Sequence, residues 1–466
     1  MGHRFFLLFI SLLCFSCLST NAIKRSNHRS KINNHINSLI EKSELDMSLG
    51  IKIISLVDGK SLYELNSEKL MIPASNVKLI TSAASLHYLG EKHIFETTIL
   101  REGDNLFLVG GADSGLSIEV LDSLAIIVSR QMEFIDTLYL DEGLLDSMHY
   151  GKGWMWDEGS EKHSAPISAL TLNNNCIDFE YSPNELGLPA KINLYPDTKY
   201  ASTTNTSLTV KDTINFKKLK IERDWRGQTN HFNITGEILE WSEKDTIKKN
   251  ITKPGLFVGT VFKELLESHG VSINTLHTAN DLHSQDTIAV HYSEPLFTHL
   301  EGMMHKSENL TSELLMKSIG ISDSTNGSWQ SGIHKVRTFL FDKVNIDTSS
   351  LRIADGSGLS RYNLLSTDQV VQLLAYMYET DYKDNFLMAL PHGGEKDTRL
   401  EERLIESQEK IYAKTGSISG VTCLSGYAFS PRYGPLTFSI MINGFVGSLT
   451  PYRQLQDEIC NWLVRS

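Results

Sequence analysis

Two residues near the start of this 466-residue sequence have the types and spacing of a serine-based catalytic pair. Ser75 and Lys78 lie three positions apart in IPASNVKLIT, at the expected start of a helix. At this spacing both side chains share one face, so the amine could take the proton of the hydroxyl. The amine must be neutral to do so, which requires burial or a nearby positive charge. A helix start would also direct backbone N–H groups toward the attacking oxygen.

A single Ser-x-x-Lys pattern is weak support for catalysis. Serine is a preferred N-cap residue, so Ser75 could simply cap the following helix. The same pattern occurs at Ser407 and Lys410, in a polar loop where no helix start is expected. The interpretation therefore depends on the rest of the chain.

Two further motifs follow in a set order. HKSENLTSELL supplies Ser307 and Asn309 ahead of a helical run, and YAKTGSISG supplies Lys414 on an expected strand. Each has an ordinary alternative: a helix cap at Asn309, an exposed strand lysine at Lys414 and a strand end at Gly416. Together, the order Ser-x-x-Lys, Ser-x-Asn, Lys-Thr-Gly is the signature of active-site serine penicillin-binding proteins and β-lactamases.

Longer stretches make the resemblance closer. The chain is similar to the D-alanyl-D-alanine carboxypeptidase/endopeptidases, the class C low-molecular-mass penicillin-binding proteins of peptidase family S13. The similarity is carried by PASNVKLITSAASLHYLG, GWMWDE, SAPISALTLNNNC, SENLTSELLMKSIG, DGSGLSRYNLLS and YAKTGSISGVTCLSGY. It implies an α/β (α+β) fold: a transpeptidase domain, with an antiparallel sheet flanked by helices, split by an insertion of two smaller β-rich domains.

The resemblance implies catalytic roles for the first two motifs. Ser75 is the nucleophile that attacks the carbonyl of the penultimate D-alanine, and Lys78 takes its proton. Ser307 and Asn309 relay a proton to the leaving amine and hold the substrate amide.

It also implies substrate-binding roles for the third motif. Lys414 supplies positive potential for the terminal carboxylate, and Thr415 and Ser417, on either side of Gly416, bind it through their hydroxyl groups. The backbone N–H groups of Ser75 and Ser417 form the oxyanion hole. The resemblance implies a peptidoglycan peptide as substrate, β-lactams as covalent inhibitors and no cofactor or metal.

Other residues are less specific. Asp157 and Glu158 lie where the family places a carboxylate near the amino group of a diaminopimelate side chain, but an acidic turn between two domains is an equal alternative. Asp355–Gly358 is expected to be a structural loop lining the cleft. PHGGEKDTRL departs from the family's wording by adding charge at Glu395 and Lys396, and His392 there is expected to be a bystander.

The pattern of apolar, glycine and proline residues predicts the secondary-structure elements that position these motifs. We expect a helix near 31–45, a hairpin around Asp58-Gly59, three strands ending with GPLTFSIMINGF and a closing helix that packs on the sheet. Between about Glu96 and Ser293 the pattern is one of short β-rich runs, turns and polar loops. The predicted ranges are 1–22 for a signal peptide, 23–95 with 291–466 for the penicillin-binding domain, 96–170 with 251–290 for inserted domain II, and 171–250 for inserted domain III.

Composition and the N-terminus limit the possible partners and location. A net charge of -12 gives no basic footprint for nucleic acid. The apolar run from Phe5 to Leu18 is shorter than the roughly 20 residues of a membrane span, so we expect export to the periplasm, with a lipid anchor on Cys17 as the alternative. Three cysteines remain after cleavage and are expected to be buried free thiols: Cys176, Cys423 and Cys460.

Two alternative functions stay open at this point. A class A β-lactamase would share the motifs, but the similar stretch here, ALTLN, has Ala169 where such enzymes have a deacylating glutamate. A catalytically silent peptidoglycan-binding protein would have no reason to retain all three motifs. The sequence does not indicate the oligomeric state.

Overall fold

The computed structural model describes residues 30–279, 286–322 and 325–465, which form two compact units. The first unit contains the described residues up to Pro73, Leu365–Lys383 and the chain from Leu390 onward. The second contains Ala74–Leu364 and Asp384–Ala389. The expected signal peptide and the alternative anchor at Cys17 lie outside the described residues. The four predicted domain ranges divide the chain differently and stay a prediction.

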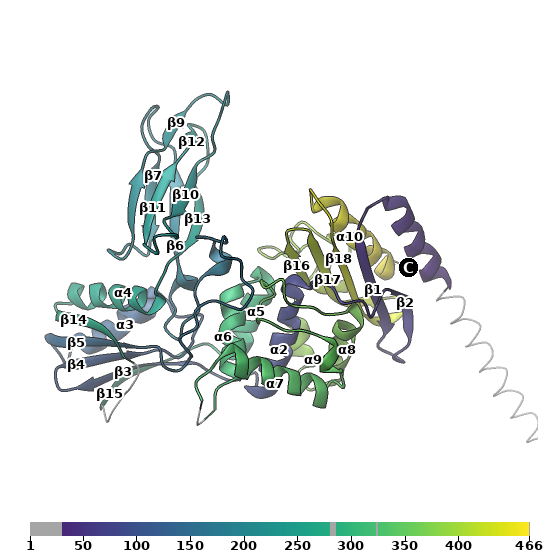
Figure 1. The fold of residues 1–466 in the computed structure, drawn as a ribbon, viewed down its shortest axis with the longest axis horizontal. Helices are drawn as coiled ribbons and strands as arrows, with labels where there is room; N and C mark the ends of the chain where they lie inside the picture. Colours follow the sequence, from purple (N-terminus) through teal and green to yellow (C-terminus); the bar gives the residue numbers. More distant parts are fainter. Residues whose placement is uncertain (1–29, 280–285, 323–324, 466) are drawn as a thin grey trace, which may run out of the picture. The chain divides into compact units, whose positions relative to one another are not determined.

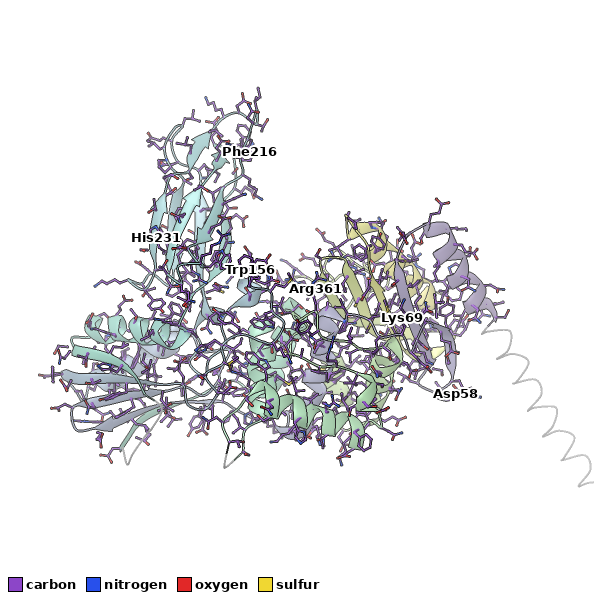
Figure 2. The ribbon with its side chains drawn as sticks, viewed as in Figure 1. Asp58, Lys69, Trp156, Phe216, His231 and Arg361 are labelled. Carbon is purple, nitrogen blue, oxygen red and sulfur yellow. The ribbon has the colours of Figure 1, made fainter. Side chains whose placement is uncertain are left out.

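A five-stranded antiparallel sheet forms the centre of the first unit (Figure 1). Its order is β16-β17-β18-β1-β2, and all four neighbouring pairs are antiparallel. The strands are β1 (Ser48–Ser55), β2 (Ser61–Leu65), β16 (Ile411–Ile418), β17 (Val421–Ser430) and β18 (Gly434–Asn443). Asp58 lies in the turn between β1 and β2 (Figure 2), so the predicted hairpin and the three C-terminal strands are confirmed.

Helices cover both faces of this sheet. A helix over residues 30–43 and α10 (Thr450–Arg465) bury apolar side chains in a common core with one face. Alternate strand residues point to the other face, where the Tyr427 hydroxyl donates to the Leu374 carbonyl of α8 (Thr367–Glu379) at 2.8 Å. Both predicted helices at the ends of the chain are confirmed. The apolar side chains of both helices are buried, so the closing helix packs on the sheet as predicted.

The second unit contains a group of packed helices that carries the first two motifs. It consists of η1 (Ala74–Asn76), α2 (Val77–Tyr88), α5 (Leu296–Lys306), α6 (Asn309–Ile319), α7 (Trp329–Asp342), the short η4 (Thr348–Ser350) and most of α9 (Lys383–Met388). Helix α2 packs against α6, and α6 packs against α7. The start of α2 and the start of α6 are therefore parts of one packed group.

A mixed sheet and two helices form another part of the second unit. The sheet order is β14-β5-β4-β3-β15. The elements are β3 (Glu96–Glu102), β4 (Asn105–Val109), β5 (Phe134–Asp141), β14 (Ser272–Ala279), β15 (Asp286–Tyr292), α3 (Ile118–Ser129) and α4 (Pro254–Ser268). The sequence interpretation of this region as β runs and loops missed both helices. In α3 the buried residues Leu121, Leu124, Ala125 and Val128 have helical spacing, which was the available signal.

Short strands make up three small sheets between Cys176 and Asn250. They are β6 (Cys176–Ser182), β7 (Lys191–Tyr195), β8 (Ser202–Asn205), β9 (Leu208–Val210), β10 (Lys220–Arg223), β11 (His231–Thr235), β12 (Glu237–Leu239) and β13 (Asp245–Asn250). Two short 3₁₀ helices, η2 (Lys162–Ser164) and η3 (Asn173–Asn175), precede them. Phe179 and Phe232 of these sheets belong to the same hydrophobic cluster as Phe257 of α4.

Cys176, Cys423 and Cys460 are free and buried, as predicted. Within the described ranges, the structure has no helix that is both long and apolar enough to cross a bilayer.

Candidate active site

Ser75 lies in a tight turn immediately before α2. The 3₁₀ helix η1 covers Ala74–Asn76, so the α-helix begins at Val77 with Asn76 as its N-cap. The suggestion that Ser75 caps this helix is therefore wrong, because the additional 3₁₀ turn moves the helix start past it. Ala74, directly before Ser75, has a φ of 46°, a strained conformation for a residue with a side chain.

Lys78 is completely buried beside Ser75. Its Nζ lies 3.1 Å from Ser75 Oγ, 2.7 Å from Asn309 Oδ1 and 2.9 Å from the Ser357 carbonyl oxygen. The amide and carbonyl oxygens only accept hydrogen bonds, so they take N–H groups of Lys78. In a neutral amine, two N–H groups satisfy these acceptors and the lone pair can accept the proton of Ser75.

Asn309 connects Lys78 to a second segment of the chain. It is the first residue of α6, and Ser307, in the left-handed conformation with a φ of 60°, joins this helix to α5. While Asn309 Oδ1 faces Lys78, its Nδ2 donates to the His163 carbonyl at 2.9 Å. These two bonds fix the orientation of the amide. The N-cap of α6 is Glu308, so the alternative role of Asn309 as a cap is wrong.

The loop Asp355–Gly358 provides the third partner of Lys78. Gly358 has a φ of +84°, and a Cβ there would lie 1.8 Å from the carbonyl oxygen of Ala74. Only glycine allows this close approach, which brings the Ser357 carbonyl to Lys78. The loop was predicted to line the cleft. What the structure shows is a backbone acceptor for Lys78, a role that side-chain types in a sequence do not indicate.

Glu313 accepts two hydrogen bonds from the backbone of this loop, and it was not identified from the sequence. Its Oε1 accepts from the Ser357 N–H and its Oε2 from the Gly356 N–H, both at 2.8 Å, and the Trp329 indole donates to Oε2 at 2.7 Å. The side chain is fully buried. Burial, with a smaller contribution from Asp355, raises the pKa of Glu313 to about 7. The available signal was a glutamate in a helix among apolar residues.

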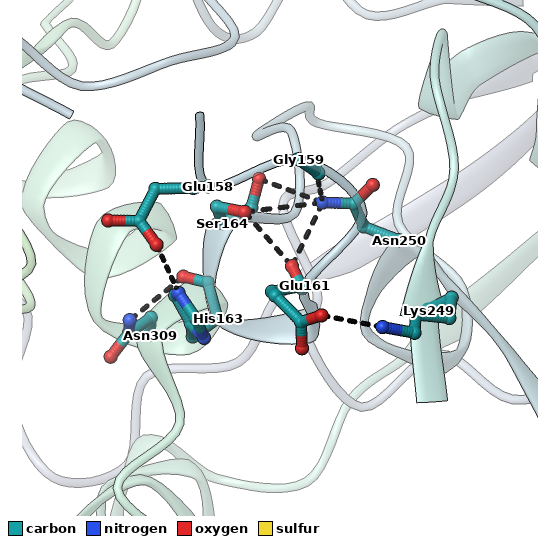
Figure 3. Close-up of polar contacts among 8 residues, drawn as sticks. All are labelled: Glu158, Gly159, Glu161, His163, Ser164, Lys249, Asn250 and Asn309. Carbon is teal, nitrogen blue, oxygen red and sulfur yellow. Dashed lines mark hydrogen bonds and ion pairs between the residues drawn. The ribbon is translucent and has the colours of Figure 1, made fainter. Parts of the chain in front are cut away.

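The acidic pair Asp157 and Glu158 divides into two environments. Glu158 Oε2 lies 2.7 Å from His163 Nε2, and the carbonyl of His163 receives the Asn309 amide (Figure 3). Asp157 is exposed. Glu158 is thus connected to the second motif through one residue.

The third motif lies on β16 in the first unit. Lys414 is fully buried and donates to the Thr415 carbonyl at 3.0 Å, so an exposed strand lysine is excluded. Gly416 is buried inside the strand, which continues to Ile418, so the strand-end alternative is also wrong. Ser417 is exposed, and its Oγ accepts from Arg453 Nη2 at 3.1 Å.

The second Ser-x-x-Lys pattern has no such surroundings. Ser407 is buried, and its hydroxyl donates to Asn461 Oδ1. It precedes η5 (Gln408–Lys410), a three-residue 3₁₀ helix where the sequence indicated a plain loop. His392 is held by its own loop, with its backbone N–H donating to Glu395 Oε2 at 2.9 Å, which fits a bystander.

Comparisons with known proteins agree with this architecture. The profile of the D-Ala-D-Ala carboxypeptidase 3 (S13) family matches residues 32–465. A D-alanyl-D-alanine carboxypeptidase of Actinomadura sp. (strain R39) is 31% identical over 440 residues, covering 88% of this chain and 81% of that protein. The crystal structure of penicillin-binding protein 4 (DacB) from Haemophilus influenzae is 24% identical to this chain and superimposes with a TM-score of 0.80. The match covers 92% of this chain and 99% of that one. The structure of the same protein in complex with a β-lactam gives a TM-score of 0.75 at 23% identity. With the family profile spanning nearly the whole chain, this protein belongs to the D-Ala-D-Ala carboxypeptidase 3 (S13) family of serine peptidases.

Proposed function

We propose that this protein hydrolyses the bond that follows a D-alanine carbonyl in peptidoglycan peptides, as a carboxypeptidase, an endopeptidase or both. The observation that carries the proposal is the Ser75–Lys78 pair, with Lys78 buried and bound to Asn309 and to the Ser357 carbonyl. In this arrangement the Lys78 amine can receive the proton of the Ser75 hydroxyl.

The reaction begins with transfer of the Ser75 proton to Lys78. The oxygen attacks the carbonyl carbon of the penultimate D-alanine, and the tetrahedral intermediate collapses as the C–N bond breaks. The leaving amine takes a proton from Lys78 by way of Ser307. Water then attacks the ester on Ser75, and its proton returns through Lys78 so that the serine hydroxyl is restored.

We assign roles to the third motif from its residue types and from its position after the other two motifs in the chain. In this proposal Lys414 supplies positive potential, Thr415 and Ser417 bind the carboxylate, and Gly416 lets the strand approach the substrate. The family resemblance assigns the oxyanion hole to the backbone N–H groups of Ser75 and Ser417; loss of one such donor costs about 10²–10³ in rate.

Asp157 and Glu158 are proposed to face a cationic side chain of the peptide. Glu158 is the better supported of the two, because His163 links it to Asn309. We also propose that the protein is exported to the periplasm, because residues 1–22 have the sequence pattern of a signal peptide and the proposed substrate is the cell wall.

Penicillins are proposed to acylate Ser75 and to be released slowly. In the ALTLN stretch, the position of the class A deacylating glutamate is occupied by Ala169, which is buried and has no group that could activate water. Rapid turnover of benzylpenicillin would contradict this assignment and favour a β-lactamase.

A fluorescent penicillin tests the nucleophile directly. The wild type should be labelled covalently and Ser75→Ala should not be labelled. Ser407→Ala is a matched control, because it removes a serine from the other Ser-x-x-Lys pattern and should leave labelling unchanged. Equal labelling of Ser75→Ala and wild type would refute the proposal. Mass spectrometry of muropeptides treated with the wild type would then separate loss of terminal alanine from opening of cross-links.

A further inference from the structure

Arg453 lies beside Ser417 in the first unit. It belongs to the first turn of α10, and its Nη2 donates to Ser417 Oγ at 3.1 Å. With one lone pair of the oxygen engaged by the guanidinium, the hydroxyl proton is directed toward another acceptor. Ser417 is exposed and lines a cavity formed with Ser419, Gly420 and Phe445. The Ser417 hydroxyl, which lines this cavity, thus lies beside the partly buried Arg453 guanidinium.

The positive charge of Arg453 is poorly compensated within the protein. A cation in the first turn of a helix opposes the helix dipole. Burial, followed by the neighbouring cation Arg403, lowers the pKa of Arg453, while Asp457 opposes this effect. Asp457, however, forms an ion pair with Arg403 at 2.6 Å and accepts hydrogen bonds from two of its nitrogens.

The guanidinium also has unused hydrogen-bonding capacity. Its Nε is buried and has no partner among the described residues. Ser417 offers Arg453 a neutral oxygen, and no ion pair to Arg453 is found in the described ranges. A guanidinium in this condition recognises an anion, and its planar set of donors matches a carboxylate best.

We propose that Arg453 is a substrate-positioning residue that binds, together with Ser417, the carboxylate of the residue leaving on the amine side of the cleaved bond. This inference rests on the proposed function, in which Ser417 contacts that carboxylate. It applies to a terminal D-alanine and equally to a cross-linked residue whose carboxylate is on the carbon next to the cleaved nitrogen. Arg453 thereby selects substrates by the charge of the leaving residue.

Two thioesters with the same N-acyl-D-alanyl group test this selection. One has mercaptoacetate as its leaving group and the other has the neutral isostere mercaptoacetamide. We expect Arg453→Gln to lower kcat/KM for the mercaptoacetate ester by about 10- to 100-fold, the range for hydrogen bonds to a charged group, and to change the amide substrate less than about 3-fold. Arg453→Lys should recover part of the loss, because it keeps the charge without the planar donors.

The matched control is Arg432→Gln. Arg432 is an exposed arginine in the turn between β17 and β18, at the other end of the hairpin from Gly420, and its loss should alter neither substrate. Equal losses for both thioesters in Arg453→Gln would overturn the proposal, since they would indicate a structural role.

The wild type provides a test that does not depend on folding of a variant. It should prefer the mercaptoacetate ester by about 10-fold or more, and the absence of a preference would overturn the role of Arg453. Failure of the proposed function gives a different result: neither thioester would be hydrolysed and Ser75 would not be labelled by penicillin.

Discussion

Replacement of Glu313 by glutamine should change how the stability of the protein depends on pH. Burial raises the pKa of Glu313 from its ordinary 4.5 to about 7 in the folded protein. Between these values the unfolded chain loses the proton while the folded protein keeps it, so ionisation favours unfolding. Stability from this group is therefore highest below about pH 4.5, falls as the pH rises toward 7 and is level above that.

The magnitude follows from the size of this shift. At about 1.4 kcal/mol per pKa unit, the difference between 4.5 and about 7 corresponds to about 3 kcal/mol, most of which is lost between pH 5 and pH 8. The glutamine in Glu313→Gln cannot ionise, so this variant should not lose stability in that way as the pH rises. Its amide nitrogen cannot accept a hydrogen bond, whereas both oxygens of Glu313 accept bonds from the three N–H donors around them. The variant should therefore be less stable than wild type at pH 5 by about 1–3 kcal/mol.

Denaturant unfolding at pH 5 and pH 8, followed by circular dichroism, measures both effects. The test quantity is the change in unfolding free energy between the two pH values in wild type, minus the same change in Glu313→Gln. This subtraction removes the contributions of other titrating groups. A difference near zero would show that Glu313 does not have a raised pKa, and the argument from its burial would fail.

Three further substitutions or treatments have defined outcomes. Gly358→Ala should abolish penicillin labelling or prevent folding, because its Cβ would overlap the Ala74 carbonyl; full labelling of a folded variant would contradict this close approach. Asn309→Ala should slow acylation about 10-fold or more in stopped-flow measurements, because Lys78 loses a 2.7 Å hydrogen bond, and an unchanged rate would refute its orienting role. Cys176, whose pKa burial raises to about 12, should react with a thiol reagent only after unfolding, and rapid labelling of the native protein would show that it is accessible.

The sequence interpretation succeeded where local pattern and packing agree. Ile32 and Ile36 on the first helix, and Ile459 and Leu463 on the last, have the four-residue spacing of one helix face, and all four are buried in one core. The three strands that precede the last helix are separated by turns that contain Gly420 and Pro431, residue types that favour turns irrespective of tertiary context. Helix α3 shows the opposite case, since its apolar residues were interpreted within a β-rich region.

Within the site, residue type and order predicted the side chains that do chemistry. Ser75, Lys78 and Asn309 were identified by their motifs, and the structure brings them together. The motifs did not predict the local backbone geometry around these side chains. The 3₁₀ turn places Asn76, not Ser75, at the N-cap position, and the loop beside Ala74 can approach it closely because Gly358 has no Cβ.

The sequence alone determined which groups are available: a hydroxyl, an amine, an amide and a second lysine on a strand, in an order that chance patterns such as Ser407 and Lys410 lack. The tertiary structure decided what surrounds them. The Ser357 carbonyl that binds Lys78 and the burial that raises the pKa of Glu313 come from contacts between segments far apart in the chain. Backbone acceptors and desolvation depend on where segments meet, and no residue type encodes them locally.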